Sequence, residues 1–220
     1  MSTTTKIAQI ISISSALMGA GGILALSLYS VPQLKAQPAD RSLPAIRWIF
    51  SRGSHTFPVA INTSTAGFLY LAYASIPSNL RTINQLFKTT NGLKVNGYLA
   101  ASILSFSIAI YTAWFMIPNN FDLIKKNEEK GGARSANAAK IVKEQGYKPG
   151  DRSAEDSVWS KGEGNEFTDF SGPMRKTESA SSEAEDREVW EKLDQFGKQN
   201  LWRALGLGLG GVVGLVTALY

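Results

Sequence analysis

The stretch GYLAASILSFSIAIYTAWFMIPNNF, residues 97–121, decides the fold because it contains no charged side chain. About 20 predominantly apolar residues in a helix are enough to cross the ~30 Å hydrocarbon layer of a bilayer. Residues 57–80 likewise contain no charged side chain. The two runs therefore predict two membrane-spanning helices, at about residues 98–117 and 57–78.

Two further apolar runs cover residues 7–31 and 201–220. A signal peptide is the alternative interpretation of the first run. That run is longer than the ~7–15-residue apolar core of such peptides, and Lys6 is the only basic residue before it. We therefore expect a retained span. The expected fold class is all-α, a four-helix transmembrane bundle in a multi-pass integral membrane protein.

Residues 118–180 differ in composition from the rest of the chain. They are rich in Lys, Glu, Gly, Ser and Asp and show no apolar periodicity. Such a segment buries too little apolar surface to offset chain entropy, so we expect a long, largely disordered polar loop. Ser182 and Glu185 then have capping-box spacing, which predicts the start of an amphipathic helix. The expected regions are 1–117 with three spans, 118–180 as the loop, and 181–220 with the amphipathic helix and last span.

The composition excludes several kinds of chemistry. The 220 residues include no Cys, so disulfides and thiolate metal ligands are absent. The sequence has one His, His55, whereas a metal site needs several converging ligands, so no metal site is expected. The net charge of +5 is modest, and the basic residues lie in the polar connections. This pattern favours contact with a lipid bilayer over nucleic-acid binding.

The last span contains GLGLGG at residues 206–211, which matches GxGxxG. A dinucleotide-binding fingerprint requires a preceding strand, whereas an amphipathic helix is expected here. Gly206, Gly210 and Gly214 also follow each other at four-residue spacing, the small-xxx-small pattern of closely packed membrane helices. We therefore expect these glycines to face another helix, such as residues 15–22 of the first span. A homo-oligomer is compatible with such packing.

Few polar residues could carry chemistry, and each also has a structural interpretation. His55, just before the second span, is either a proton acceptor or a solvated residue at headgroup depth. Arg52 binds either lipid phosphates or an enolate oxygen. Asn62 either contacts a substrate or joins helices by hydrogen bonds. Trp48 is typical of an interface anchor and less often forms a pocket wall.

Several sequence features, given below in chain order, resemble those of the anthrone-oxygenase-like family. Members of this family are small four-helix membrane proteins, and many of them have no assigned function. The likeness covers the whole chain except the polar loop, which would be an insertion. Many relatives have His where this chain has Asn200. The matching features are the glycine-rich first span ending at Pro32, then Trp48, Arg52-Gly53 and Pro58, then Pro118-Asn119-Asn120 with Leu123, and finally Trp190, Leu193, Asn200 and Arg203.

Family members with an assigned role are fungal polyketide-pathway enzymes that oxidise an anthrone to an anthraquinone with molecular oxygen. The resemblance implies a cofactor-independent monooxygenase of secondary metabolism, located in a eukaryotic endomembrane, with a small aromatic polyketide and O2 as its partners. His55 would be the catalytic base, and Arg52, Asn119 or Asn120 would stabilise the oxyanion. Trp48 and Asn62 would contact the substrate. The alternative function is a non-catalytic four-span scaffold or assembly protein.

Overall fold

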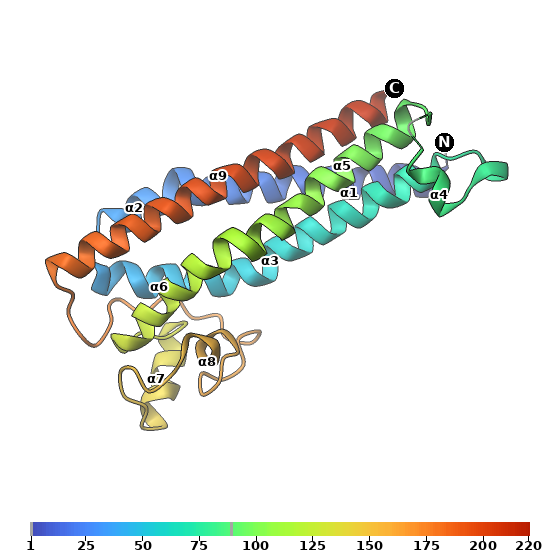
Figure 1. The fold of residues 1–220 in the computed structure, drawn as a ribbon. Coiled ribbons are helices and arrows are strands. Elements are labelled where there is room, and N and C mark those ends of the chain that lie inside the picture. Colours follow the sequence, from blue (N-terminus) through green and yellow to red (C-terminus); the bar gives the residue numbers. More distant parts are fainter. Residues whose placement is uncertain (1, 89) are drawn as a thin grey trace. The chain divides into compact units, whose positions relative to one another are not determined.

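The computed structural model describes residues 2–88 and 90–220, and every regular element among them is a helix (Figure 1). The expected all-α class is confirmed. In chain order the elements are α1 (Thr3–Ala25), η1 (Leu26–Ser30), α2 (Val31–Lys35), α3 (Ala39–Ala74), η2 (Ser78–Leu80), α4 (Ile83–Leu86), α5 (Leu93–Tyr111), η3 (Thr112–Met116), α6 (Ile117–Glu129), α7 (Ala136–Glu144), α8 (Ala154–Val158) and α9 (Glu183–Leu219).

Within the described residues, three helical stretches are long and apolar enough to cross a membrane: Thr3–Lys35, Leu93–Glu129 and Glu183–Leu219. They contain the predicted spans 7–31 and 98–117 and all but the last residue of 201–220, and they indicate an integral membrane protein. The predicted span 57–78 is helical as far as the end of α3, but α3 is not among the three. Its apolar run is interrupted by the polar residues Asn-Thr-Ser-Thr at 62–65. The count of four spans is therefore not confirmed.

The chain divides into two compact units. The first unit contains the chain up to Ala25, together with Thr56–Ala113 and Asn200–Tyr220. The second unit contains Leu26–His55 and Trp114–Gln199. The long helices α3 and α9 each contribute residues to both units.

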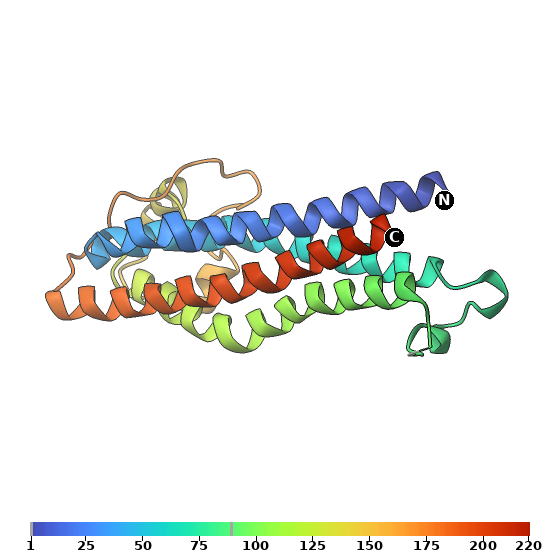
Figure 2. The same cartoon turned by 90° about the horizontal axis from the view of Figure 1, so that it is seen from above.

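In the first unit, parts of α1, α3, α5 and α9 run alongside one another (Figures 1 and 2). Phe68 and Leu207 are completely buried in the core of this bundle. Buried polar groups pair across helices, because an unpaired polar group is costly in hydrocarbon. Gln9 in α1 donates a hydrogen bond to the hydroxyl of Tyr98 in α5 over 2.6 Å. The outer surface is apolar, with Met18 77% exposed, as expected of a surface in contact with lipid.

Glycines of α9 lie where neighbouring helices approach closely. A Cβ added at Gly210 would lie 2.8 Å from Oγ of Ser105 in α5, and Gly206 faces the same helix. Gly214 lies against α3. The first span is approached by another residue, Gly211. The three glycines at four-residue spacing therefore contact α5 and α3, and the suggested pairing with residues 15–22 is wrong.

Residues 118–180 do not form the largely disordered loop that their composition predicts. They continue α6 and then form α7 and α8, with the side chains of Ser135 and Ser153 capping these two short helices. Arg134 and Glu163 are buried within this region. Ion pairs and helix caps stabilise the segment. A prediction from composition considers only the apolar surface that the segment can bury, so it takes neither of them into account.

The capping box predicted at the start of α9 is confirmed. The Ser182 N–H donates to the Glu185 carboxylate over 2.7 Å, and the Glu185 N–H donates to Oγ of Ser182 over 3.4 Å. The amphipathic helix and the last span form one continuous element, α9.

Candidate functional site

Trp48, Arg52 and His55 lie on one face of α3, because residues three or four positions apart are neighbours on a helix surface. The backbone of residues 163–171 runs along this face. Trp48 Nε1 donates to the carbonyl of Ser171 over 3.0 Å. Arg52 donates to the carbonyl of Glu166 over 3.4 Å and to that of Asp169, and it stacks on the Trp48 ring at 5.6 Å. These contacts attach the 163–171 segment to α3.

His55 lies against the same segment. Its Nε2 atom is 3.2 Å from Oε1 of Glu166, and its ring centroid is 4.6 Å from that of Phe167. The side chain is 33% exposed, yet Nε2 itself is buried, and among the described residues it has no partner in hydrogen-bond geometry. One ring nitrogen therefore faces a carboxylate in the interior, while another part of the ring remains accessible.

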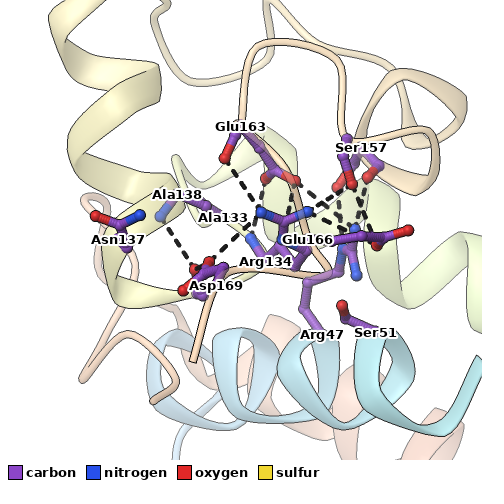
Figure 3. A network of polar contacts seen from close by, with 12 residues as sticks. Arg47, Ser51, Ala133, Arg134, Asn137, Ala138, Ser157, Glu163, Glu166 and Asp169 are labelled. Atoms are coloured by element: carbon purple, nitrogen blue, oxygen red, sulfur yellow. Dashed lines mark hydrogen bonds and ion pairs between the residues drawn. The ribbon is translucent and has the colours of Figure 1, made fainter. Parts of the chain in front are cut away.

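A cluster of buried arginines and carboxylates anchors the 163–171 segment. Figure 3 shows Arg134 between Glu163 and Asp169. The Arg134 guanidinium donates to Oγ of Ser160 over 2.6 Å and to the carbonyl of Glu163 over 3.1 Å, and it lies 3.4 Å from the Asp169 carboxylate. Arg134 is only 2% exposed, so this cluster replaces almost all of its hydration.

Two further arginines join the cluster from other elements. Arg47 of α3 donates to Oγ of Ser157 over 2.9 Å and to its carbonyl over 2.6 Å. Arg152 lies 3.0 Å from the Glu163 carboxylate and 3.5 Å from that of Glu128. Burial lowers the pKa of Arg47 from its ordinary value, and the charge of Glu163 opposes this effect. The opposite charges of the arginines and carboxylates offset much of the free-energy cost of removing these ions from water.

The Asp169 carboxylate accepts hydrogen bonds from several protein groups. Burial alone would raise the pKa of Asp169, but hydrogen bonds from Ser135 and Ser171 lower it below its usual range. The Ser171 hydroxyl donates over 2.7 Å and its N–H over 3.0 Å. Asp169 is therefore held in its charged form at neutral pH.

A cavity of about 160 Å³ lies beside this cluster. It is smaller than the roughly 300–1,000 Å³ of typical small-molecule pockets, but an engineered cavity of about 150 Å³ binds benzene. One aromatic ring therefore fits. The cavity is lined by the apolar residues Phe50, Ile117, Phe121, Ile124 and Val158 and by the polar residues Arg47, Ser51, Ser54, Asn120 and Glu166.

Two polar atoms of the cavity-lining residues are buried without a hydrogen-bond partner among the described residues. They are Oγ of Ser51 and Oδ1 of Asn120. A buried polar group without a partner is unfavourable, so both atoms are suited to hydrogen bonding with a bound molecule. Glu166 lines the cavity and also contacts His55, which is not itself a lining residue.

The remaining predicted residues lie elsewhere. Asn119 is buried and donates from Nδ2 to the carbonyl of Lys192 over 3.1 Å, so it joins α6 to α9 and does not line the cavity. Asn62 is exposed, and it belongs to the first unit. In that unit Asn200 accepts a hydrogen bond from Arg203 over 2.9 Å. Asn200 therefore acts as an acceptor for an arginine.

Over residues 2–88 and 90–220, no three or more His, Asp or Glu side chains are grouped so that they could hold a metal ion. The carboxylates of the buried cluster are paired with arginines instead. Sequence reasoning missed Ser51 and Glu166. Ser51 is four positions from both Arg47 and His55, so helical spacing could have placed it on the same face of the helix as these residues. Nothing in the sequence around Glu166 distinguishes it from the other acidic residues of the loop.

The helices and the cavity define a small all-α membrane protein with a partly polar pocket, and the lining residue Glu166 contacts its one histidine. A sequence model of the anthrone oxygenase family matches residues 47–160, just over half of the 220 residues, and the chain belongs to that family. The matched range includes residues 118–160 of the polar region and ends before residue 161. No curated protein and no solved structure matches the chain.

Proposed function

We propose that the protein oxidises an anthrone to an anthraquinone with molecular oxygen, as part of polyketide metabolism and without a metal or flavin. Family membership supports this reaction class. The observation that carries the proposal is that Glu166 both lines a cavity that fits an aromatic ring and contacts His55, the one histidine of the chain. Both His55 and the cavity residue Asn120 lie in the matched range.

The chemistry suits a site with one base. The methylene between the two aryl rings of an anthrone is acidic, because its anion is a delocalised, phenolate-like system. His55 takes one methylene proton, and the carbanion passes one electron to O2. Superoxide and the substrate radical combine to a peroxide, which accepts a proton and loses water as the O–O bond and the second methylene C–H bond break. Anthrone and O2 thus give anthraquinone and water, with carbon oxidised and oxygen reduced.

The surrounding residues take different roles in this proposal. One substrate ring enters the cavity, where Oδ1 of Asn120 accepts a hydrogen bond from a hydroxyl of the substrate. The hydroxyl of Ser51 and the Nδ2–H of Asn120 donate to the developing oxyanion. Arg52 and Trp48 are engaged with backbone carbonyls of the 163–171 segment, so we assign them to holding that segment. Asn119 is engaged with α9 and is left out of the oxyanion site.

The experiment is quinone formation by purified protein in detergent, with anthrone and oxygen and no added metal or flavin. Anthrones autoxidise, so the relevant quantity is the rate above a heat-killed control. His55→Ala should lower this excess rate by roughly 10²-fold or more if the residue is the general base. Glu144→Ala, at an exposed position of α7, is the matched control.

Two outcomes would contradict the proposal. An excess rate that is unchanged in His55→Ala would remove His55 from the mechanism. A wild-type rate equal to that of the heat-killed protein would favour the non-catalytic scaffold.

A further inference from the structure

Glu166 is held from several sides at once. Its Oε2 atom accepts a hydrogen bond from Oγ of Ser160 over 3.2 Å and lies 3.7 Å from Nη1 of Arg134. Its carbonyl accepts from Arg52 over 3.4 Å. The other carboxylate oxygen, Oε1, lies 3.2 Å from Nε2 of His55, which is within ion-pair distance but is not in hydrogen-bond geometry. Both ends of the residue are therefore fixed, and one oxygen is left to contact the imidazole.

We propose that Glu166 is a positioning residue for His55, which rests on the proposed function. A protonated Nε2 pairs with this carboxylate across the 3.2 Å between them, which fixes the imidazole in one tautomer and leaves Nδ1 as the nitrogen that takes a proton. A general base that is oriented by a third group is a recurring arrangement in enzymes. The carboxylate also stabilises the imidazolium that forms when the methylene proton is taken.

A purely structural role for Glu166 explains less of the geometry. Arg134 already has Asp169 at 3.4 Å and the carbonyl of Glu163 at 3.1 Å, both closer than the 3.7 Å to Glu166. The contact between Glu166 and His55 is shorter, at 3.2 Å. Arg52 also lies on this face of α3, and its guanidinium is engaged by backbone carbonyls.

The buried cluster of arginines and carboxylates has a role in this arrangement. Buried ion pairs add little net stability compared with apolar packing, so their retention needs another explanation. Here the cluster fixes the 163–171 segment, and that segment carries the carboxylate to the histidine. Glu166 lies outside the matched range 47–160, so this chain supplies the orienting carboxylate from beyond the family's matched region.

The test uses the fact that the chain has one histidine. In full-length protein labelled with ¹⁵N-histidine in detergent, the spectrum contains one imidazole, and His55→Gln confirms its origin. The wild type should show an Nε2–H proton at low field that exchanges slowly with water, and an unprotonated Nδ1. Glu166→Ala should abolish the slow exchange. Glu166→Gln, which keeps the size of the side chain but loses its charge, should accelerate it at least about 10-fold.

Turnover provides the second readout. Glu166→Gln should lower kcat for quinone formation by about 10-fold, a smaller loss than that of His55→Ala, with little change in KM. Glu144→Gln is the matched control, since this carboxylate is exposed on α7. An unchanged protease-cleavage pattern in Glu166→Gln verifies that the 163–171 segment is still folded.

The spectrum of His55 and the rate of quinone formation distinguish failure of the His55–Glu166 pairing from failure of the proposed function. A His55 spectrum that is the same in the wild type and in both Glu166 variants would overturn the proposed pairing, whatever the activity. A wild type that forms no quinone above background would refute the proposed function alone, because the spectrum reports the pair without turnover.

Discussion

Replacing Arg134 with Ala should release the 163–171 segment from the rest of the second unit. Arg134 is 2% exposed, and its loss leaves the fully buried Glu163 with one fewer cation. Removing one partner of a buried ion pair costs about 3–5 kcal/mol. Arg152, 3.0 Å from Glu163, compensates in part, so we expect the lower end, about 3 kcal/mol. At ~1.4 kcal/mol per factor of ten, the opened segment should be populated roughly 100-fold more often.

Limited proteolysis measures that population. Cleavage of a transiently opened segment follows its equilibrium population when opening is fast. Chymotrypsin should therefore cut after Phe167 and Phe170 roughly 100-fold faster in Arg134→Ala than in the wild type. Arg175→Ala, at an exposed position of the same region, is the control. A cleavage rate in Arg134→Ala that equals that of the control would refute the anchoring role of the buried cluster.

Three further predictions concern other parts of the chain. Gly210→Leu should destabilise the helix bundle by about 1–3 kcal/mol and lower the thermal midpoint in detergent, whereas Gly21→Leu should not, because a Cβ there meets nothing within 4 Å; equal midpoints would contradict the close approach of α9 to α5. Because the pKa of Asp169 is lowered, its stabilisation is present above the ordinary carboxyl pKa near 3.9 and is lost as the pH falls through the lowered value. Chymotrypsin sensitivity measured after acid pulses should thus rise below about pH 4, and Asp169→Asn should flatten this dependence; an unchanged profile would argue against it. Asn120→Ala should lower the quinone-forming rate more than Asn119→Ala does, and the reverse order would place the oxyanion donor at Asn119.

Most of the helices could be predicted from the sequence, because the information is local. The uncharged run at 97–121 predicts α5 and the start of α6, and the spacing of Ser182 and Glu185 predicts the start of α9. The shared face of Arg52 and His55 follows from helical periodicity alone. The span at 57–78 was the weakest of the four predictions, because the polar residues at 62–65 dilute its hydropathy.

The order in residues 118–180 could not be predicted, because it depends on contacts between residues far apart in the chain. Arg134 and Asp169 are 35 positions apart, and Arg47 and Ser157 are 110 positions apart. Composition reports the number of charges in a segment and says nothing of whether they pair. Which asparagine lines the cavity was also undetermined, because neighbours on a helix differ by about 100° in direction, and only the packing of α6 against α9 directs Asn119 to Lys192.

The most direct test of the proposed reaction is isotope incorporation from ¹⁸O2. Purified wild-type protein in detergent, treated with a chelator, is mixed with anthrone and ¹⁸O2, and the quinone is analysed by mass spectrometry against heat-killed and His55→Ala samples. Above the heat-killed background, we expect quinone carrying a single ¹⁸O atom in the new carbonyl group, one O2 consumed per quinone, and loss of this excess in His55→Ala. Quinone formation and ¹⁸O content equal to those of the heat-killed protein would contradict the claim that this chain is an oxygenase.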